Sequence, residues 1–388
     1  MGVPMSLRLP SVTGPHPVGC TDIMVGLGKE GSFFRFYYPS ASSCDQQHPL
    51  WAPSTEYTTG LVSSLGMESK AAQYGASLIL GRSRIPVSWN GPILHGTDKR
   101  PLIIFSHGLG AFRAVYSSLC SELASHGFLV AAVEHKDGSA CATYYFEDLP
   151  HTHSQGHPQK VWVPFRKVDP GMKEFYLRNY QLHQRATECV KAVRVLENIN
   201  AGMIESSITV TDFQLHNLTG RIDLSRVAIM GHSFGGASAL LSLVKDDIFR
   251  CAIGLDAWMF PLENAAYPNI QKPTLFINNE NFQTASSIQK MKKLNFGQEG
   301  AKIVTVLGSV HQSPTDFAFM TGYMANKILG PRGTIDPQIC LEATVASALS
   351  FLYKHLVLPE DSPKLLKLSG AIRDHLIEDV SSADSSKL

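Results

Sequence analysis

Ser233 is the residue whose surroundings point most clearly to covalent chemistry. It is the centre of Gly-His-Ser-Phe-Gly at residues 231–235, a G-x-S-x-G pattern. A serine on a sharp turn can attack a carbonyl carbon, and glycines on both sides allow the close chain approach that such a turn needs. Chance alone produces the pattern in about one chain in ten, so its meaning depends on the neighbouring elements.

The segments that flank Ser233 favour a nucleophilic role. Residues 226–230 form a short apolar run typical of a buried strand, and residues 237–245 have the composition of a helix. A strand, a tight turn and a helix in this order direct backbone N–H groups, such as that of Phe234, toward a developing oxyanion. The alternative is a glycine-rich helix start in which Ser233 is only a cap.

A second turn could supply the other half of an oxyanion-binding site. Residues 106–110, Ser-His-Gly-Leu-Gly, directly follow a strand-like run at residues 101–105. Hydrolases with this type of serine turn take one N–H donor from the loop after an earlier strand. We therefore expect the backbone N–H of Leu109 to act together with that of Phe234.

His311 is the histidine that its position selects as general base. The chain has 15 histidines, but in hydrolases of this kind the base follows the nucleophile and lies on the loop after the last strand. Residues 303–307 are the last clear strand-like run, and His311 comes shortly after it. The other histidines near the expected site precede or adjoin the nucleophile, so we expect supporting hydrogen bonds from His107, His135 and His232.

Two carboxylates compete for the role of the acid. Asp256 follows the strand-like run at residues 251–255, and Glu280 comes after the next run at residues 274–277. Either carboxylate could hold the imidazole of His311 in the required tautomer and stabilise its protonated form. Position alone leaves the choice open.

The apolar runs predict the fold class. Together with a further run at residues 128–133 they are separated by helix-length segments, as the crossover connections of a parallel sheet require. Residues 33–38 are expected to form an edge or hairpin strand. We predict an α/β-hydrolase fold with a mostly parallel central sheet flanked by helices. We expect one domain over residues 1–388. It contains an N-terminal segment (1–14), lid-like insertions (51–100 and 140–225) and a polar tail (about 360–388).

Composition excludes several other classes of protein. The formal net charge is +1 and no dense run of Lys and Arg occurs, so we expect no nucleic-acid partner. The chain has 7 cysteines without a C-x-x-C pair, which favours a reducing compartment over a disulfide framework. No apolar stretch is long enough to span a bilayer. These features predict a cytoplasmic protein and do not indicate an oligomeric state.

Four motifs resemble the platelet-activating factor acetylhydrolases. They are Phe-Ser-His-Gly-Leu-Gly-Ala-Phe-Arg (105–113), Gly-His-Ser-Phe-Gly-Gly (231–236), Asp-Ala-Trp-Met-Phe-Pro (256–261) and Gly-Ser-Val-His-Gln (308–312). The similarity extends from about residue 14 to about residue 356. In that family the acid lies in the third motif, which favours Asp256 over Glu280.

The resemblance implies a function and a set of site residues. It implies a calcium-independent, lipase-like hydrolase that needs no metal or other cofactor and removes short or oxidised acyl chains from the sn-2 position of phospholipids. It also implies a triad of Ser233, Asp256 and His311, with the backbone of Leu109 and Phe234 as oxyanion hole. Two alternatives are a broader carboxylesterase or lipase and a catalytically silent lipid-binding protein. The intact triad residues argue against the silent protein.

Several features predict reversible contact with a membrane. The start Met-Gly with Ser6 matches the pattern for myristoylation of Gly2, and the resemblance is to the intracellular, myristoylated type of the family. An ordinary polar start is the alternative. In the family, segments at the places of two apolar patterns touch lipid, although such patterns are more often core helices. One pattern lies at residues 61–80, and the other consists of Tyr323, Met324, Ile328 and Leu329.

Overall fold

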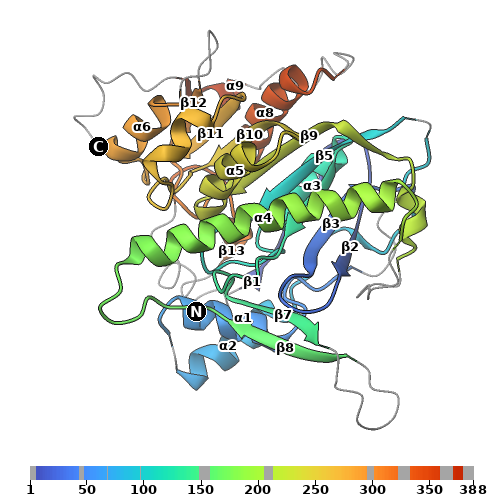
Figure 1. The fold of residues 1–388 in the computed structure, drawn as a ribbon, viewed down its shortest axis with the longest axis horizontal. Coiled ribbons are helices and arrows are strands. Elements are labelled where there is room, and N and C mark those ends of the chain that lie inside the picture. The colour runs from blue at the N-terminus through green and yellow to red at the C-terminus, as the bar shows by residue number, and fades with distance from the viewer. Residues whose placement is uncertain are drawn as a thin grey trace.

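A ten-stranded sheet forms the centre of the molecule (Figure 1). The structure is a computed structural model that describes residues 6–42, 48–67, 69–96, 98–147, 158–204, 213–294, 301–321, 333–358 and 370–378. In spatial order the strands are β14 (Leu376–Glu378), β12 (Lys302–Val306), β11 (Thr274–Asn279), β10 (Phe249–Leu255), β9 (Ile222–His232), β5 (Arg100–Ser106), β6 (Leu129–Val133), β3 (Ser32–Pro39), β2 (Val18–Val25) and β4 (Ser88–Trp89).

The predicted fold class is confirmed by this sheet. From β12 to β6 in this spatial order, adjacent strands run parallel to one another. These strands contain all the apolar runs that the sequence predicts as core strands. The strand predicted at residues 33–38 is β3, which forms an antiparallel hairpin with β2. It is not an edge strand, because its other side pairs with β6.

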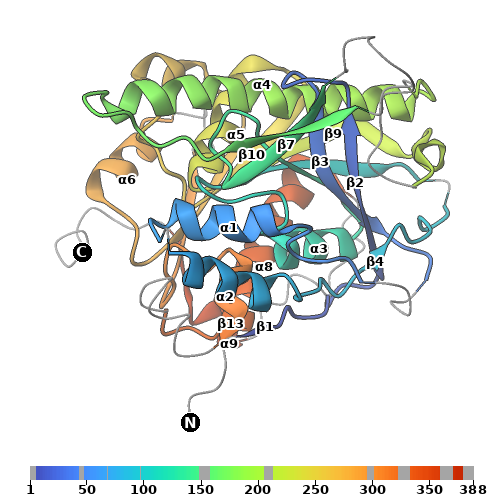
Figure 2. The ribbon, with the colours of Figure 1, turned by 90° about the horizontal axis from the view of Figure 1, so that it is seen from below.

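Helices cover both faces of the sheet (Figure 2). Helices α4 (Glu174–Asn200) and α5 (Phe234–Lys245) pack on one face, and α3 (Ser117–Ser125) and α8 (Pro337–His355) pack on the other. Successive residues of a strand point to opposite faces, so β5 places Leu102 in one buried core and Ile103 in the other. Burial on both faces explains why these strands are continuous apolar runs.

Smaller elements lie outside this layered core. Within residues 51–100, α1 (Thr55–Ser64) packs on α2 (Lys70–Leu80). Within residues 140–225, a hairpin precedes α4, which itself covers the sheet, so this stretch contributes a layer of the core as well as an excursion. The remaining elements are β7 (Ala142–Glu147), β8 (Gln159–Pro164), β1 (Ser6–Leu7), β13 (Met320–Thr321), α6 (Ala285–Lys292), α9 (Gly370–Arg373), and the 3₁₀ helices η1 (Leu215–Leu218), η2 (Asn264–Asn269) and η3 (Asp316–Phe319).

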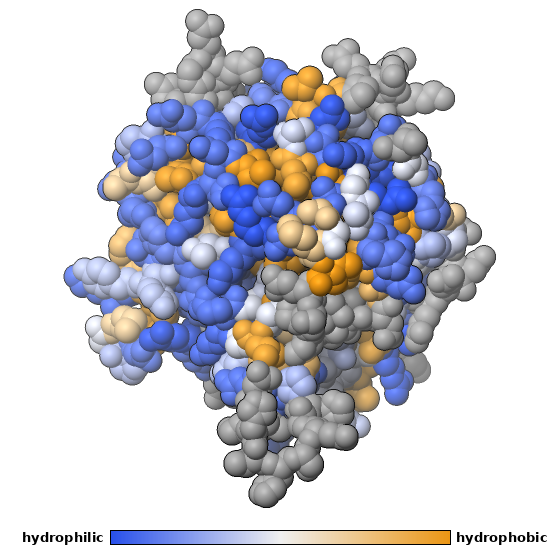
Figure 3. Space-filling model, turned by 45° about the vertical axis from the view of Figure 1, so that its right-hand side comes forward, coloured by the Kyte–Doolittle hydropathy of each residue, from blue (hydrophilic) through white to orange (hydrophobic). Residues whose placement is uncertain are grey.

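None of the helices in the described ranges combines the length and the apolar content that crossing a bilayer requires. One side of the molecule carries apolar side chains in several separate groups among hydrophilic ones (Figure 3).

Candidate active site

Ser233 lies at the sharp turn between β9 and α5. Its φ of 54° is in the left-handed region that residues with a side chain rarely adopt, which indicates a strained backbone. A Cβ atom on Gly231 would overlap the carbonyl oxygen of Gly235, and a Cβ on Gly235 would overlap that of Ser106. The two glycines of the G-x-S-x-G pattern are therefore required by close packing of backbone on backbone.

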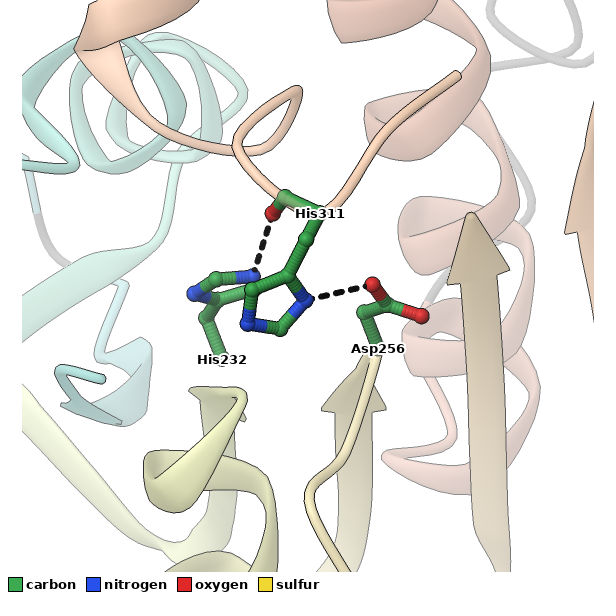
Figure 4. A group of neighbouring side chains, drawn as sticks. All are labelled: His232, Asp256 and His311. Atoms are coloured by element: carbon green, nitrogen blue, oxygen red, sulfur yellow. Dashed lines mark hydrogen bonds and ion pairs between the residues drawn. The ribbon is translucent and has the colours of Figure 1, made fainter. Parts of the chain in front are cut away.

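His311 joins Ser233 and Asp256 through hydrogen bonds. Its Nε2 lies 3.0 Å from Ser233 Oγ. Its Nδ1 lies 2.6 Å from Asp256 Oδ2, as Figure 4 shows. Because a carboxylate accepts, Nδ1 carries the ring proton and Nε2 is left to accept the serine proton. Asp256 is 2% exposed and also accepts bonds from the backbone and side-chain N–H groups of Asn279, at 3.1 and 3.0 Å.

Glu280, the other acid candidate, occupies a different place. One of its carboxylate oxygens accepts a hydrogen bond from the backbone N–H of Gly308 at 2.6 Å, at the start of the loop that leads to His311. Gly308 has a φ of 74°, so the carboxylate holds the loop at a tight turn. The structure thus pairs His311 with Asp256 and uses Glu280 to hold the loop.

The turn after β5 packs directly against the serine. A Cβ atom on Gly108 would be in ordinary contact with the Cβ of Ser233, at 3.4 Å, and would come within 2.9 Å of the Tyr116 hydroxyl, so a side chain here would displace Tyr116. Within the described ranges, no protein acceptor takes the backbone N–H of Leu109. Phe234 is the first residue of α5, where backbone N–H groups have no partner inside the helix. Both N–H groups predicted to bind an oxyanion are therefore next to Ser233.

The peptide bond between Gly108 and Leu109 is held from its carbonyl side. The carbonyl oxygen of Gly108 accepts hydrogen bonds from His107 Nδ1 at 2.8 Å and from the backbone N–H of Ala111 at 3.3 Å. Since N–H and C=O point in opposite directions across a planar peptide, these bonds also set the direction of the Leu109 N–H. The predicted hydrogen-bonding role of His107 is confirmed.

Comparison with known proteins places the chain in a family. The family model described as platelet-activating factor acetylhydrolase, isoform II, matches residues 1–373. The chain belongs to this family. Proteins named platelet-activating factor acetylhydrolase from Gallus gallus and Canis lupus familiaris are each 42% identical to it, over 97% and 91% of this chain and 90% and 78% of their own lengths.

Two further comparisons extend the likeness of this acetylhydrolase-family chain, one in sequence and one in fold. A putative phospholipase A2 of Schizosaccharomyces pombe is 26% identical over 92% of this chain and 94% of its own length. A solved structure of a ferulic acid esterase from Streptomyces cinnamoneus superposes with a TM-score of 0.65, covering 95% of this chain and 98% of the esterase. At 19% identity the likeness shows the fold alone.

Arg185 is a site residue that the sequence did not reveal. This fully buried guanidinium donates hydrogen bonds to the carbonyl oxygen of His107, to Ser106 Oγ at 3.2 Å and to Ser238 Oγ at 2.9 Å. It also lies over the ring of Phe234, 4.5 Å from the ring centroid. Arg185 thus ties the turn after β5 to the start of α5. A polar residue in the apolar stripe of α4 is the signal that could have found it.

A second hydrogen-bonded chain supports Ser106 from behind. His135 Nε2 lies 2.8 Å from Ser106 Oγ, and His135 Nδ1 lies 2.6 Å from the Glu188 carboxylate. Burial and the charge of Arg185 lower the pKa of His135 well below its usual value. Burial raises the pKa of Glu188 to about 7 and that of Asp137 to about 6. The predicted hydrogen-bonding role of His135 is confirmed.

Aromatic rings pack against the imidazole of His311. The ring of Phe282 stacks on it with a centroid distance of 3.7 Å, and the ring of His232 lies 4.6 Å away. Nothing in the sequence around Phe282 marks it as a site residue, because the contact depends on the loop after β11. Such packing restricts the rotamers of His311 and keeps its Nε2 near Ser233.

Three side chains that could ligate a metal meet here, but their bonds favour proton transfer. Suitable atoms of His232, Asp256 and His311 lie within 4.8 Å of one another. His311 Nδ1 is bonded to Asp256, and His232 Nε2 faces the carbonyl oxygen of His311 at 2.9 Å. A nitrogen that donates a proton to a carbonyl cannot bind a cation at the same time.

The predicted membrane-contact and lipidation residues lie outside the described ranges. They are Gly2, Tyr323, Met324, Ile328 and Leu329.

Proposed function

We propose that the chain is a calcium-independent serine hydrolase that removes short or oxidised acyl groups from the sn-2 position of phospholipids. The observation that carries the proposal is the hydrogen-bonded series from Ser233 through His311 to Asp256 in a member of the acetylhydrolase family. The names of its 42% identical relatives supply the acetyl ester as substrate class.

In the first half of the reaction, Ser233 is the nucleophile and His311 is the base. The serine Oγ attacks the sn-2 carbonyl carbon while its proton moves to His311 Nε2. Asp256 stabilises the imidazolium through the bond to Nδ1. The negative charge that develops on the carbonyl oxygen is bound by the backbone N–H groups of Leu109 and Phe234.

The second half returns the enzyme to its starting state. The carbon–oxygen bond to the glycerol breaks, and the departing sn-2 oxygen takes the proton from His311 to become the hydroxyl of a lysophospholipid. Water then attacks the acyl-serine, with His311 again as base. The products are a short carboxylic acid and free Ser233, and no step uses a metal ion.

Hydrolysis measured in a calcium chelator tests this function. We expect phosphatidylcholine with an sn-2 acetyl group to be cleaved in preference to the same lipid with a long sn-2 chain. The Ser233→Ala variant should lose the activity, typically by more than about a thousandfold in kcat. Preferential turnover of long-chain lipids or of simple esters would contradict the proposal and favour the broader carboxylesterase or lipase.

We also propose that the protein is cytoplasmic and binds membranes reversibly through one side. Exposed apolar side chains directly after α1 and on α2 support this: Leu65 is 49%, Tyr74 68% and Leu78 45% exposed. Strand β1 near the N-terminus contacts α2 and pairs with β13, which directly precedes the second predicted contact segment. A myristoyl group on Gly2 would thus start from the same side, and one acyl chain alone binds membranes only marginally.

Vesicle co-sedimentation tests the membrane proposal. Replacing Tyr74 and Leu78 together by serine should weaken binding to phosphatidylcholine vesicles while leaving hydrolysis of dissolved substrate unchanged. A Lys70→Ser variant at the exposed start of α2 is the control. Unchanged vesicle binding by the double variant would contradict the contact surface. Intact mass measurement of the N-terminal peptide from cells tests the lipid, and an unmodified Gly2 would remove it.

A further inference from the structure

His232 connects two loops of the site, although it lies beside the nucleophile and not on either loop. It is 2% exposed, and its Nε2 lies 2.9 Å from the carbonyl oxygen of His311 (Figure 4). On the other side of the ring, its Nδ1 lies 2.8 Å from the hydroxyl of Tyr116. The same hydroxyl oxygen accepts a hydrogen bond from the backbone N–H of Gly108 at 3.0 Å.

The carbonyl oxygen of His311 determines the direction of every hydrogen bond in this series. A carbonyl oxygen cannot donate, so Nε2 of His232 must carry a proton that points at His311. In a neutral imidazole Nδ1 is then an acceptor, and the hydroxyl of Tyr116 must donate to it. Burial, and then the neighbouring His311, lower the pKa of His232 well below its usual value, which is consistent with the neutral form. The hydroxyl oxygen remains free to accept from Gly108.

We propose that Tyr116 and His232 are positioning residues, which fix the loop of the general base relative to the oxyanion turn. The inference rests on the proposed function, because it concerns the base and the oxyanion donors of that reaction. Neither side chain contacts Ser233 Oγ or the two oxyanion N–H groups. Their hydrogen bonds act through the backbone of His311 and of Gly108, whose next residue is Leu109.

The topology shows that the strands themselves do not make this connection. The oxyanion turn follows β5 and the loop of His311 follows β12, and β9, β10 and β11 separate these two strands in the sheet. No ladder of strand hydrogen bonds therefore joins the two loops directly. In the reaction both loops must act on one carbonyl group, and a misplacement of about 1 Å can reduce the rate by about a hundredfold.

Kinetics of Tyr116→Phe and of two His232 variants test the proposal. Tyr116→Phe removes the hydroxyl and leaves the ring. His232→Gln keeps an N–H that can reach the His311 carbonyl, whereas His232→Leu removes both polar contacts. We expect kcat to fall about tenfold to a hundredfold in Tyr116→Phe and His232→Leu, with little change in KM, and to fall less in His232→Gln.

A double variant separates a connected series from two independent effects. If the two side chains act as one chain, Tyr116→Phe combined with His232→Leu should be no slower than the slower single variant. Tyr37→Phe is the control, because it removes another buried tyrosine hydroxyl, whose hydrogen bond goes to Ser117 at 3.1 Å, and should keep wild-type kcat. A wild-type kcat in either Tyr116→Phe or His232→Leu, or multiplying losses in the double variant, would overturn the proposal.

Active-site titration makes the kcat values of the variants comparable. Titration with a fluorophosphonate gives the concentration of folded sites, so kcat refers to folded protein even if a variant is less stable. If Tyr116→Phe fails to fold, the comparison of His232→Leu with His232→Gln decides. An inactive wild-type protein would contradict the proposed function itself, whereas an active wild type with unaffected variants would contradict only this inference.

Discussion

Two buried arginines, Arg113 and Arg185, have opposite surroundings. Arg113 contacts carboxylates on both sides, with Asp22 at 2.6 Å and Glu134 as ion-pair partners. The bonds of Arg185 instead go to hydroxyl groups and to the carbonyl oxygen of His107. Among the described residues, no carboxylate forms an ion pair with Arg185.

The difference separates a scaffold from a part of the site. The charge of Arg113 is neutralised where it lies, by Asp22 of β2 and by Glu134, which directly follows β6. Arg185 lies behind the oxyanion turn, and its charge is not neutralised by a direct contact. A positive charge beside the developing oxyanion stabilises the transition state if it is held in place in advance. The first arginine should therefore govern stability and the second should govern kcat.

The largest expected effect is on stability, from Arg113→Met. Glu134 would remain buried without its ion-pair partner and Asp22 would keep only Arg35, so the free energy of unfolding should fall by about 3–5 kcal/mol. Urea unfolding measures this loss. The folded fraction, counted by fluorophosphonate titration, should keep a kcat near that of the wild type. A loss below about 1 kcal/mol, the range of an exposed ion pair, would break the comparison.

Arg185→Met should have the complementary result. Loss of the bonds to His107 and Ser106 releases the oxyanion turn, so kcat should fall about a hundredfold. Arg185→Lys keeps the charge but not the planar fork, so it should recover only part of the rate. Steady-state kinetics with the sn-2 acetyl substrate checks both. An unchanged kcat in Arg185→Met would show that this arginine, too, is only scaffold.

The sequence predicted part of the active site and nothing of the ion-pair cluster around Arg113. The elements around Ser233 are local, so a buried strand, glycines and a helix start are visible in a short window. The choice of acid is not local. It depends on the loop after β10, where Asp256 has a φ of 45°, and on the bonds from Asn279 of β11. Sequence position therefore left Asp256 and Glu280 equal until the family motif separated them.

Arg185 escaped prediction for a related reason. It lies among the buried residues of α4, and nothing in the neighbouring sequence shows that α4 crosses behind the oxyanion turn. The apolar runs predicted the core strands well, because burial on both faces leaves a continuous pattern. Short strands such as β4 and β14 were missed, since they contain few residues and pair at the edges of the sheet.

The two regions should also respond to pH in opposite ways. Burial alone would raise the pKa of Asp22, but Arg113 and Arg35 lower it. The stability that Asp22 contributes is therefore present above its unfolded pKa near 3.8 and is lost as pH falls below that value. Burial raises the pKa of Glu188 from 4.5 to about 7. An acid whose pKa is higher in the folded state stabilises that state at low pH. The stability that Glu188 contributes is therefore lost as pH rises from about 4.5 to 7.

Glu188→Gln isolates the second of these responses. Between pH 5 and 7 the wild type should lose up to about 1.4 kcal/mol of stability per pH unit from this group, and the variant should lack that slope. Urea unfolding at a series of pH values gives the slope. Equal slopes in the two proteins would mean that Glu188 does not change its protonation on unfolding in this range.

The smallest expected effect comes from Ser106→Ala. The change removes an oxygen shared by His135 and Arg185, but Arg185 keeps its other bonds. One such bond is worth about 1 kcal/mol, so kcat should fall roughly fivefold. A loss of a hundredfold or more would instead place Ser106 in the chemistry, since the series from Ser106 through His135 to Glu188 resembles a triad.

The most direct test of the account is the site of covalent modification. The protein is treated with a fluorophosphonate, digested and sequenced by mass spectrometry, in parallel with Ser233→Ala and Ser106→Ala. The account predicts one phosphonyl group, on Ser233, in the wild type and in Ser106→Ala, and none in Ser233→Ala, with hydrolysis of the acetyl lipid lost in step. Modification of another serine, or acetyl-lipid hydrolysis that persists in Ser233→Ala, would contradict it.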